Sequence, residues 1–168
     1  ADASSVGANV NMDHVVVKNN TSTDQAGGIL IRQQSNVTIT NSVISDNTAG
    51  RGGAMLIVEG SYVSLNNVLI TNNIAINHGG GIGINDRADL DLNNCTITNN
   101  SCGTDGAGIW MAYTSNNITV VNIDSTEISG NVCPNNGYGG GISVFDGAEL
   151  NVSYSVIKGN GNNSGGGV

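Results

Sequence analysis

Carboxylates gather in one short stretch of the chain, where they could hold a metal ion or act on a sugar polymer. Asp86, Asp89 and Asp91 lie close together beside Arg87, and Glu59 stands about one repeat earlier. Calcium prefers oxygen ligands of this kind, and glycoside hydrolysis needs a pair of close carboxyl groups. Charges on a solvated turn give the same pattern. We therefore expect no catalytic residue, no metal ion and no cofactor.

The two histidines and the glycine runs add no further chemistry. His78 directly precedes Gly79, Gly80 and Gly81, but a phosphate-binding loop also needs a following helix and a lysine. No Ser, His and Asp fall at matching positions of the repeats, as a catalytic triad would require. His14 and His78 are expected to be structural. The sequence thus favours a protein without enzymatic activity.

Composition excludes several classes of partner. The chain has 168 residues with 25 Gly, a single Pro and 4% aromatic residues, which is typical of short strands and tight corners. Its formal net charge is -8, and its five Lys and Arg are spread singly. No basic stripe is available for nucleic acid. No apolar run approaches the ~20 residues that span a bilayer, so membrane insertion is not expected and the chain should be soluble.

An asparagine recurs at one phase of a repeating pattern, three residues after a Val or Ile. The six positions are Asn20, Asn47, Asn73, Asn100, Asn131 and Asn160, and we expect them to belong to a structural ladder. A glycine-rich segment ends each time just before a short apolar strand, at Gly28, Gly53, Gly81, Gly108, Gly141 and Gly167. Fixed periods of this length indicate a solenoid.

The third repeat shows how one coil is built. Three alternating segments point inward with Ile82 and Ile84, then Leu90 and Leu92, then Cys95 and Ile97. A sharp corner falls between the second and third segments, at Asn41, Asn67 and Asn94 in successive coils. Asparagine tolerates the left-handed backbone, and stacked amides there are expected to form a ladder inside the corner. The ladder is interrupted at His14, Ser125 and Tyr154.

These features predict an all-β fold. It is a right-handed parallel β-helix, a solenoid of about six coils with three short strands per coil, and residues 1–168 form one such segment. The surplus residues of the longer repeats fall in turns, at 113–117 and 132–138. Insertions in turns leave the core intact.

Two of the three cysteines occupy equivalent positions. Cys102 and Cys133 each lie two residues past a repeating asparagine. Strands of adjacent coils are ~4.8 Å apart, a separation that a disulfide accepts, so we predict a bridge between these residues. Such a bridge indicates an oxidising compartment. Two free thiols in a loop remain the alternative, and Cys95 is expected to be a buried small side chain.

A family resemblance appears in the run Leu-x-Leu-x-Asn-x-x-Ile-x-x-Asn, seen at residues 90–100, together with the Gly-Gly-Ile of residues 140–142. It resembles the repeats of polymorphic outer membrane proteins, within the pectin lyase-like superfamily of right-handed parallel β-helices. The resemblance covers essentially the whole chain, which has Ile where those repeats often place Phe. It implies a secreted or surface-displayed protein, such as an adhesin or passenger domain, often without enzymatic activity.

The outward side chains predict two apolar faces. The third strands present Val16, Val43, Leu69 and Val156, and the first strands present Leu30, Met55, Trp110 and Phe145. Contiguous apolar surface usually marks a contact site. The plainer interpretation is that β-rich surfaces carry Val and Leu, and that the single Trp is covered by its own loop. The second strands present a polar column suited to solvent.

The expected function is that of a secreted or cell-surface β-helix with a structural or adhesive role, part of a larger extracellular assembly or filament. Its partners would be proteins, through self-association or the rest of a longer chain. The open strand edges at both ends suit either a fragment of a longer solenoid or an end-stacking unit. The alternative is a carbohydrate-binding or polysaccharide-lyase-related β-helix, with glycans held by Trp110 and Phe145 on the first-strand face.

Overall fold

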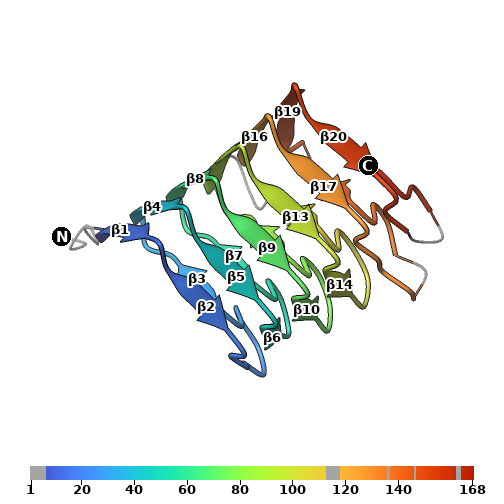
Figure 1. Ribbon diagram of the computed structural model, residues 1–168, viewed down its shortest axis with the longest axis horizontal. Helices are drawn as coiled ribbons and strands as arrows, with labels where there is room; N and C mark the ends of the chain where they lie inside the picture. The colour runs from blue at the N-terminus through green and yellow to red at the C-terminus, as the bar shows by residue number, and fades with distance from the viewer. Residues whose placement is uncertain (1–6, 113–117, 136, 146, 162–163) are drawn as a thin grey trace.

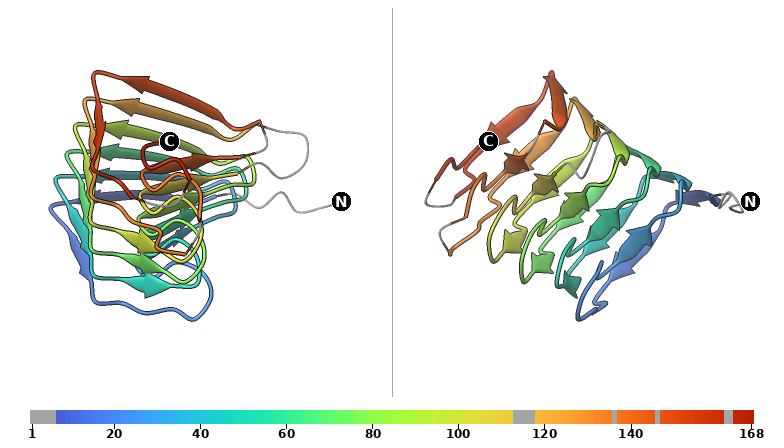
Figure 2. Two further views of the ribbon diagram at one scale, coloured as in Figure 1. Left: turned by 90° about the vertical axis from the view of Figure 1, so that its right-hand side faces the viewer. Right: turned by 180° about the vertical axis from the view of Figure 1, so that it is seen from behind.

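The computed structural model describes residues 7–112, 118–135, 137–145, 147–161 and 164–168, and within them every regular element is a β-strand. Successive coils lie side by side from the first strands to the last (Figure 1), and Figure 2 shows the same stack from two further directions. All strand pairs are parallel. The all-β solenoid that the repeats predict is thus confirmed. The expected insertion at 113–117 lies outside the described residues.

Three long sheets form the sides of the solenoid. The second-strand sheet contains β1 (Asn9–Asp13), β4 (Asn36–Thr40), β8 (Tyr62–Asn66), β12 (Asp89–Asn93), β16 (Val120–Asp124) and β19 (Glu149–Ser153). The third-strand sheet contains β2 (Val16–Lys18), β5 (Val43–Ser45), β9 (Leu69–Thr71), β13 (Thr96–Thr98), β17 (Glu127–Ser129) and β20 (Val156–Lys158). The first-strand sheet contains β3 (Ile29–Ile31), β7 (Met55–Ile57), β11 (Ile82–Ile84), β15 (Ile109–Met111) and β18 (Ile142–Val144).

A fourth, short sheet was not predicted. It consists of β6 (Thr48–Ala49), β10 (Ile74–Ala75) and β14 (Ser101–Cys102) and directly follows the repeating asparagine. Each strand has only two residues, too few to show an alternating pattern in the sequence. This sheet nevertheless continues the parallel stacking through the turn after the third strand.

Inward side chains form one continuous apolar core. The six residues expected to point inward in the third coil, from Ile82 to Ile97, are all buried. Equivalent residues of neighbouring coils pair in register, for example Leu65 with Leu92 and Leu92 with Ile123. Full burial of one such side chain contributes roughly 1.5 to 3 kcal/mol. The core therefore supplies the main stabilisation of each coil.

One residue expected on the outer surface, Met55, faces the core instead. It pairs in register with Ile29 and Ile82 and has 0% exposure. The outward position of β7 belongs to Leu56. Because side chains alternate along a strand, a shift of one residue exchanges inside and outside. The prediction for Met55 is therefore wrong.

The cause of this shift is a single alanine in the second coil. Ala54 takes the place that Gly28 and Gly81 hold in the neighbouring coils, as the pairing one residue later shows. The glycine run of this coil thus ends one residue early, at Gly53. A strand counted from that glycine begins one residue too soon.

The repeating asparagines form a hydrogen-bonded ladder along the solenoid. Each Nδ2 donates to the Oδ1 of the asparagine one coil later, at 2.9 to 3.0 Å, through Asn20, Asn47, Asn73, Asn100, Asn131 and Asn160. The same Oδ1 accepts the backbone N–H of the preceding asparagine. The second Nδ2 hydrogen reaches a backbone carbonyl of the preceding coil. Since these side chains are mostly buried, the ladder satisfies polar groups that water cannot reach.

The corner asparagines behave differently. Asn41, Asn67 and Asn94 have the left-handed backbone predicted for them, with φ of 49°, 55° and 51°. Their side chains are exposed, so the expectation of a ladder inside this corner is wrong. Only Asn67 donates to another corner asparagine, Asn41, at 2.8 Å. The buried ladder is formed by the asparagines from Asn20 to Asn160, where the chain turns into the fourth sheet.

Close approach of the backbone explains the glycine that precedes the first strand. A Cβ on Gly81 would lie 2.6 Å from the carbonyl oxygen of Gly108 and 3.3 Å from Nδ2 of Asn100. A side chain at Gly81 would therefore require the backbone of the next coil to shift, whereas the second coil accommodates the Cβ of Ala54 at the equivalent place. In the described part of the chain, no helix is long and apolar enough to cross a membrane.

Candidate functional site

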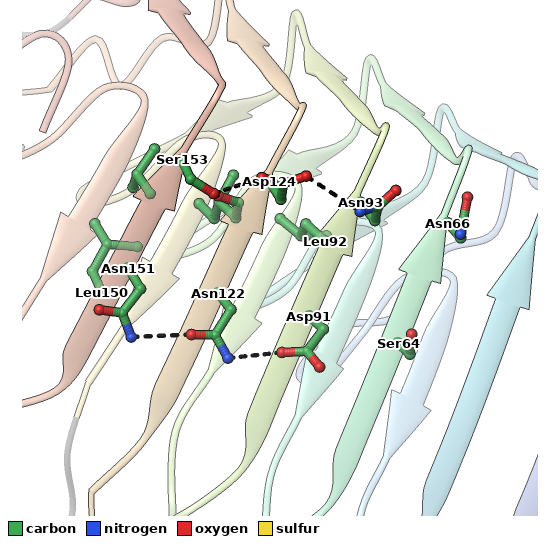
Figure 3. Close-up of a pocket in the computed structure, with 12 residues that line it drawn as sticks. Ser64, Asn66, Asp91, Leu92, Asn93, Asn122, Asp124, Leu150, Asn151 and Ser153 are labelled. Atoms are coloured by element: carbon green, nitrogen blue, oxygen red, sulfur yellow. Dashed lines mark hydrogen bonds between the residues drawn. The ribbon is translucent and has the colours of Figure 1, made fainter.

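A groove runs across the outer face of the second-strand sheet (Figure 3). Its volume is about 690 Å³. Its lining includes the apolar residues Leu92, Ile123, Leu150 and Val152. The polar lining residues are Ser64, Asn66, Asp91, Asn93, Asn122, Asp124, Asn151 and Ser153. They come from β8, β12, β16 and β19, so the groove crosses four coils.

Four outward side chains form a hydrogen-bonded row along the first edge of this groove. Asn151 donates to Asn122 at 3.0 Å, and Asn122 donates to Asp91 at 2.8 Å. The Tyr62 hydroxyl donates to the second oxygen of Asp91 at 2.5 Å. This bond raises the pKa of Tyr62 above its ordinary value. The parallel register sets the row, because Asp91, Asn122 and Asn151 are paired residues of adjacent strands.

A second row lies two residues further along the same strands. Ser153 donates to Asp124 at 2.6 Å, and Asn93 donates to the other oxygen of Asp124 at 3.4 Å. Figure 3 shows both rows running across the strands with their polar groups on the same face. The side chains are thus held in position by their neighbours.

The second-strand face carries negative charge and no positive residue. All five Lys and Arg of the chain lie outside this sheet, whereas Asp13, Asp89, Asp91, Asp124 and Glu149 lie on it. Hydrogen-bond donors stabilise the ionised form of one of these carboxylates, Asp13. Hydrogen bonds from Thr40 and Asn41, and then from His14, lower the pKa of Asp13 to about 2.

The third-strand face has the apolar column that the sequence predicts. Val16 and Val156 are 59% and 49% exposed, and Val43 and Leu69 are half-buried between them along the sheet. Glu127 interrupts the column and pairs with Lys158 at 3.2 Å. A hydrogen bond from Ser129, together with Lys158, lowers the pKa of Glu127. Whether this column contacts a partner stays a prediction.

The outer face of the first-strand sheet is largely covered. Leu30 is 41% exposed, but Leu56 is only 2% exposed because the preceding glycine turn folds over it. Trp110 stacks on His78, with ring centroids 4.9 Å apart. His78 in turn contacts Asp105 at 3.1 Å. A turn from the preceding coil therefore occupies one face of the Trp110 ring. The plainer interpretation expected a cover from the loop of Trp110's own coil, so it named a different segment from the one that stacks here.

Phe145 lies beyond the end of β18 and not on its outward column. Its ring meets that of Tyr138 edge to face, with centroids 6.3 Å apart. Tyr138 belongs to the expected insertion at 132–138. The backbone N–H of Tyr138 donates to Asp105. Trp110 and Phe145 are thus each engaged by a turn and do not form one open platform.

The acidic cluster divides among different partners. Asp89 accepts the backbone N–H of Val120 at 3.1 Å, and Asp91 belongs to the polar row of the groove. In the described ranges, no three residues of the His, Cys, Asp and Glu types are arranged to hold a metal ion.

Cys102 and Cys133 form a disulfide between successive coils, with a Cα separation of 4.8 Å. This is the pairing that their equivalent positions predict. Both residues are buried with Ala75 and Ala107 in a small cluster apart from the main core. Cys95 is a free, buried thiol, and burial raises its pKa. The thiolate is therefore disfavoured at Cys95.

Sequence reasoning missed the groove. The sequence predicts a solvent-facing surface for the polar column of the second strands and a glycan-binding face on the first strands. The available signal was the recurrence of Asp and Asn at outward positions of consecutive coils, Asp91, Asn122 and Asn151. Only the register shows that these residues bond to one another.

Comparison with known proteins supports the fold alone. No curated protein and no solved structure is significantly similar to the chain. Residues 17–168 match the family described as "Right handed beta helix region". This match covers most of the chain and agrees with the parallel strands and the stacked coils. The protein therefore belongs to the right-handed β-helix family.

Proposed function

We propose that the chain is a secreted or cell-surface β-helix with a structural and adhesive role, one part of a larger extracellular assembly or filament. In this role the chain presents flat, rigid outer faces to its partners and does not catalyse a reaction. The β-helix fold itself is compatible with structural and binding roles and also occurs in enzymes. The apolar column of the third-strand face is the observation that carries the assembly role.

The side chains of that column are partly exposed and regularly spaced. Val16, Val43 and Leu69 are paired residues of adjacent strands, so their side chains repeat at the coil spacing on a flat surface. Flat apolar rows of this kind lose water readily when a second surface covers them. The charged pair of Glu127 and Lys158 interrupts the column in the last two strands, so contact is expected at Val16, Val43 and Leu69.

Sedimentation velocity over a range of concentrations tests the assembly role. We expect the natural chain to associate at high concentration and the double variant Val43→Ser with Leu69→Ser to remain monomeric. The matched control, Thr38→Ala with Ser64→Ala, changes outward residues of the same two coils on the second-strand face and should associate normally. A natural chain that stays monomeric at every concentration would remove the support for assembly through this face.

The extracellular setting rests on the disulfide. Bridges of this kind persist in oxidising compartments and are rare where thiols are kept reduced. Thiol labelling of the native material under denaturing conditions should modify Cys95 alone. Labelling of all three cysteines would contradict the proposed setting.

A glycan partner is the second candidate. For such a partner, the groove on the second-strand face is the better binding site than the face around Trp110. One side of the Trp110 ring is already stacked on His78. The groove, by contrast, offers ordered polar groups from four coils. Binding of a sugar chain would make the solenoid adhesive without any catalytic residue.

A further inference from the structure

Short sequences of the type Asn-x-Ser/Thr recur along the chain, and such a sequence is the acceptor for N-linked glycosylation. Within the described ranges they begin at six exposed residues, Asn19, Asn20, Asn36, Asn94, Asn99 and Asn151. Two more begin outside the described residues, at Asn117 and Asn162. The buried ladder asparagines begin none, because the second residue after each is Ala or Cys, as at Asn47, Asn73, Asn100 and Asn131. The acceptor sequences thus fall on asparagines that solvent reaches.

The amide groups of these six asparagines divide them into two sets. A glycan replaces one hydrogen of Nδ2, so an amide that already donates its hydrogens is a poor site. Asn151 donates both of its amide hydrogens, and Asn20 and Asn36 each donate one to a neighbouring coil. The other three donate no side-chain hydrogen bond to any residue that the structure describes, namely Asn19, Asn94 and Asn99. A glycan on these three disturbs no contact between the coils.

The backbone also places these three asparagines for attachment. Asn19, Asn94 and Asn99 have φ of 59°, 51° and 56°, in the left-handed region that asparagine tolerates at turns. Asn19 directly follows β2, Asn99 directly follows β13, and Asn94 lies at the corner before β13. All three side chains are exposed. Each amide therefore stands at a turn on the outside of the solenoid, where a bulky group extends into solvent.

We infer that Asn19, Asn94 and Asn99 carry N-linked glycans. This inference rests on the proposed secreted or cell-surface function, because the transfer takes place during export. The disulfide between Cys102 and Cys133 fits the same oxidising route. The donor is an oligosaccharide joined through a diphosphate to a lipid carrier. A bond forms between Nδ2 and the anomeric carbon, the bond from that carbon to the diphosphate oxygen breaks with its electron pair staying on the diphosphate, and Nδ2 gives up one proton.

The glycans would be distributed unevenly along the third-strand sheet. Asn94 and Asn99 flank β13 at both of its ends, whereas the turns around β5 and β9 begin no acceptor sequence. Those two strands present Val43 and Leu69, the centre of the apolar column. The glycans thus shield the coil beyond Leu69 and leave the centre of the column open to a protein partner.

Mass spectrometry of peptides from the natural protein tests the inference. An amidase that releases N-linked glycans converts each modified Asn to Asp, and in heavy-oxygen water the new carboxyl group keeps one heavy oxygen. We expect the heavy oxygen at Asn19, Asn94 and Asn99 and not at Asn20 or Asn151. A parallel digest without the amidase corrects for spontaneous deamidation. Its absence from all three expected sites, or its presence only at Asn20, Asn36 or Asn151, would overturn the inference.

Variants of the secreted chain separate the acceptor sequence from the fold. Thr96→Ala removes the acceptor sequence of Asn94 and should abolish the glycan there, whereas Thr96→Ser keeps the hydroxyl group and should restore it. The matched control is Thr98→Ala, on the same strand and outside both acceptor sequences, which should retain every glycan. A glycan on Asn94 that persists in Thr96→Ala would overturn its assignment as an N-linked site.

The state of the cysteines distinguishes a failure of this inference from a failure of the proposed function. Thiol labelling that finds Cys102 and Cys133 bridged in natural chains without glycans at the three sites would overturn the inference alone. The assembly role would then still stand, because it depends on the sedimentation of the Val43 and Leu69 variant.

Discussion

The Nδ2 of Asn73 donates to the Oδ1 of Asn100 at 3.0 Å, and the same oxygen accepts the backbone N–H of Asn73 at 2.9 Å. Both residues are buried. One side chain thus satisfies two donors of the preceding coil. This relationship repeats along the chain and ties the turns after the third strands together.

Replacing Asn73 with Ala should therefore destabilise the protein strongly. The change removes the acceptor of two donors on Asn47 and leaves buried groups unpaired, at a cost of about 1 to 3 kcal/mol for each group. Denaturant unfolding should show a loss of roughly 2 to 5 kcal/mol in the free energy of unfolding. Asn66→Ala, on the exposed face of the same coil, is the control and should change it by less than about 1 kcal/mol. Equal losses in the two variants would mean that the ladder adds no stability.

The register of the second coil predicts opposite behaviour for two residues of the first-strand sheet. Met55→Ala should cost about 2 to 5 kcal/mol because it opens a cavity in the core, whereas Leu30→Ala should cost about 1 kcal/mol or less because Leu30 is 41% exposed. Unfolding curves of the two variants check this difference. A larger loss for Leu30→Ala would place Met55 on the surface again.

Asp13 should titrate far below an ordinary aspartate. Its pKa is lowered from 3.8 to about 2, first by the hydrogen bond from Thr40 and then by those from Asn41 and His14. Since the folded pKa is the lower one, the stabilisation is fully present above about pH 4 and is lost as the pH falls toward 2. A side-chain NMR titration should give a midpoint near 2 in the natural chain and a higher midpoint in Thr40→Val. An unchanged midpoint in that variant would show that the Thr40 hydroxyl has no such effect.

The disulfide should stabilise the chain by closing a loop of the unfolded state. Cys102 and Cys133 are 31 residues apart, and a loop of this size corresponds to roughly 3 to 4 kcal/mol. Thermal unfolding of the double variant Cys102→Ala with Cys133→Ala should therefore occur at a lower temperature. A reductant should shift the natural chain in the same direction and leave the variant unchanged. A shift of similar size in the variant would point to an effect of the reductant elsewhere.

Much of the architecture can be predicted from the order of residues alone. Alternating apolar residues such as Ile82 and Ile84 determine which side chains face inward, because the side chains of a strand alternate. The repeating asparagine fixes the phase of every coil, and equivalent positions bring Cys102 next to Cys133. These properties are local or recur at the same place in each coil, so a single sequence reveals them.

Other properties depend on contacts between coils that lie far apart in the chain. Ala54 hid the true register of the second coil, and only strand pairing showed that Met55 is buried and Leu56 is outward. The cover of Trp110 by His78 comes from a turn of the preceding coil. Of the two sets of asparagines expected to form a ladder, only the buried set from Asn20 to Asn160 does so, because the corner asparagines are exposed.

The groove shows the same division. The sequence determines that Asp91, Asn122 and Asn151 occupy outward positions, because strand alternation depends only on local order. That they bond to one another, and that Asp124 forms a parallel row beside them, was decided by the tertiary structure. Side chains about one coil apart in sequence meet only when the parallel register aligns their strands at the ~4.8 Å spacing of a sheet.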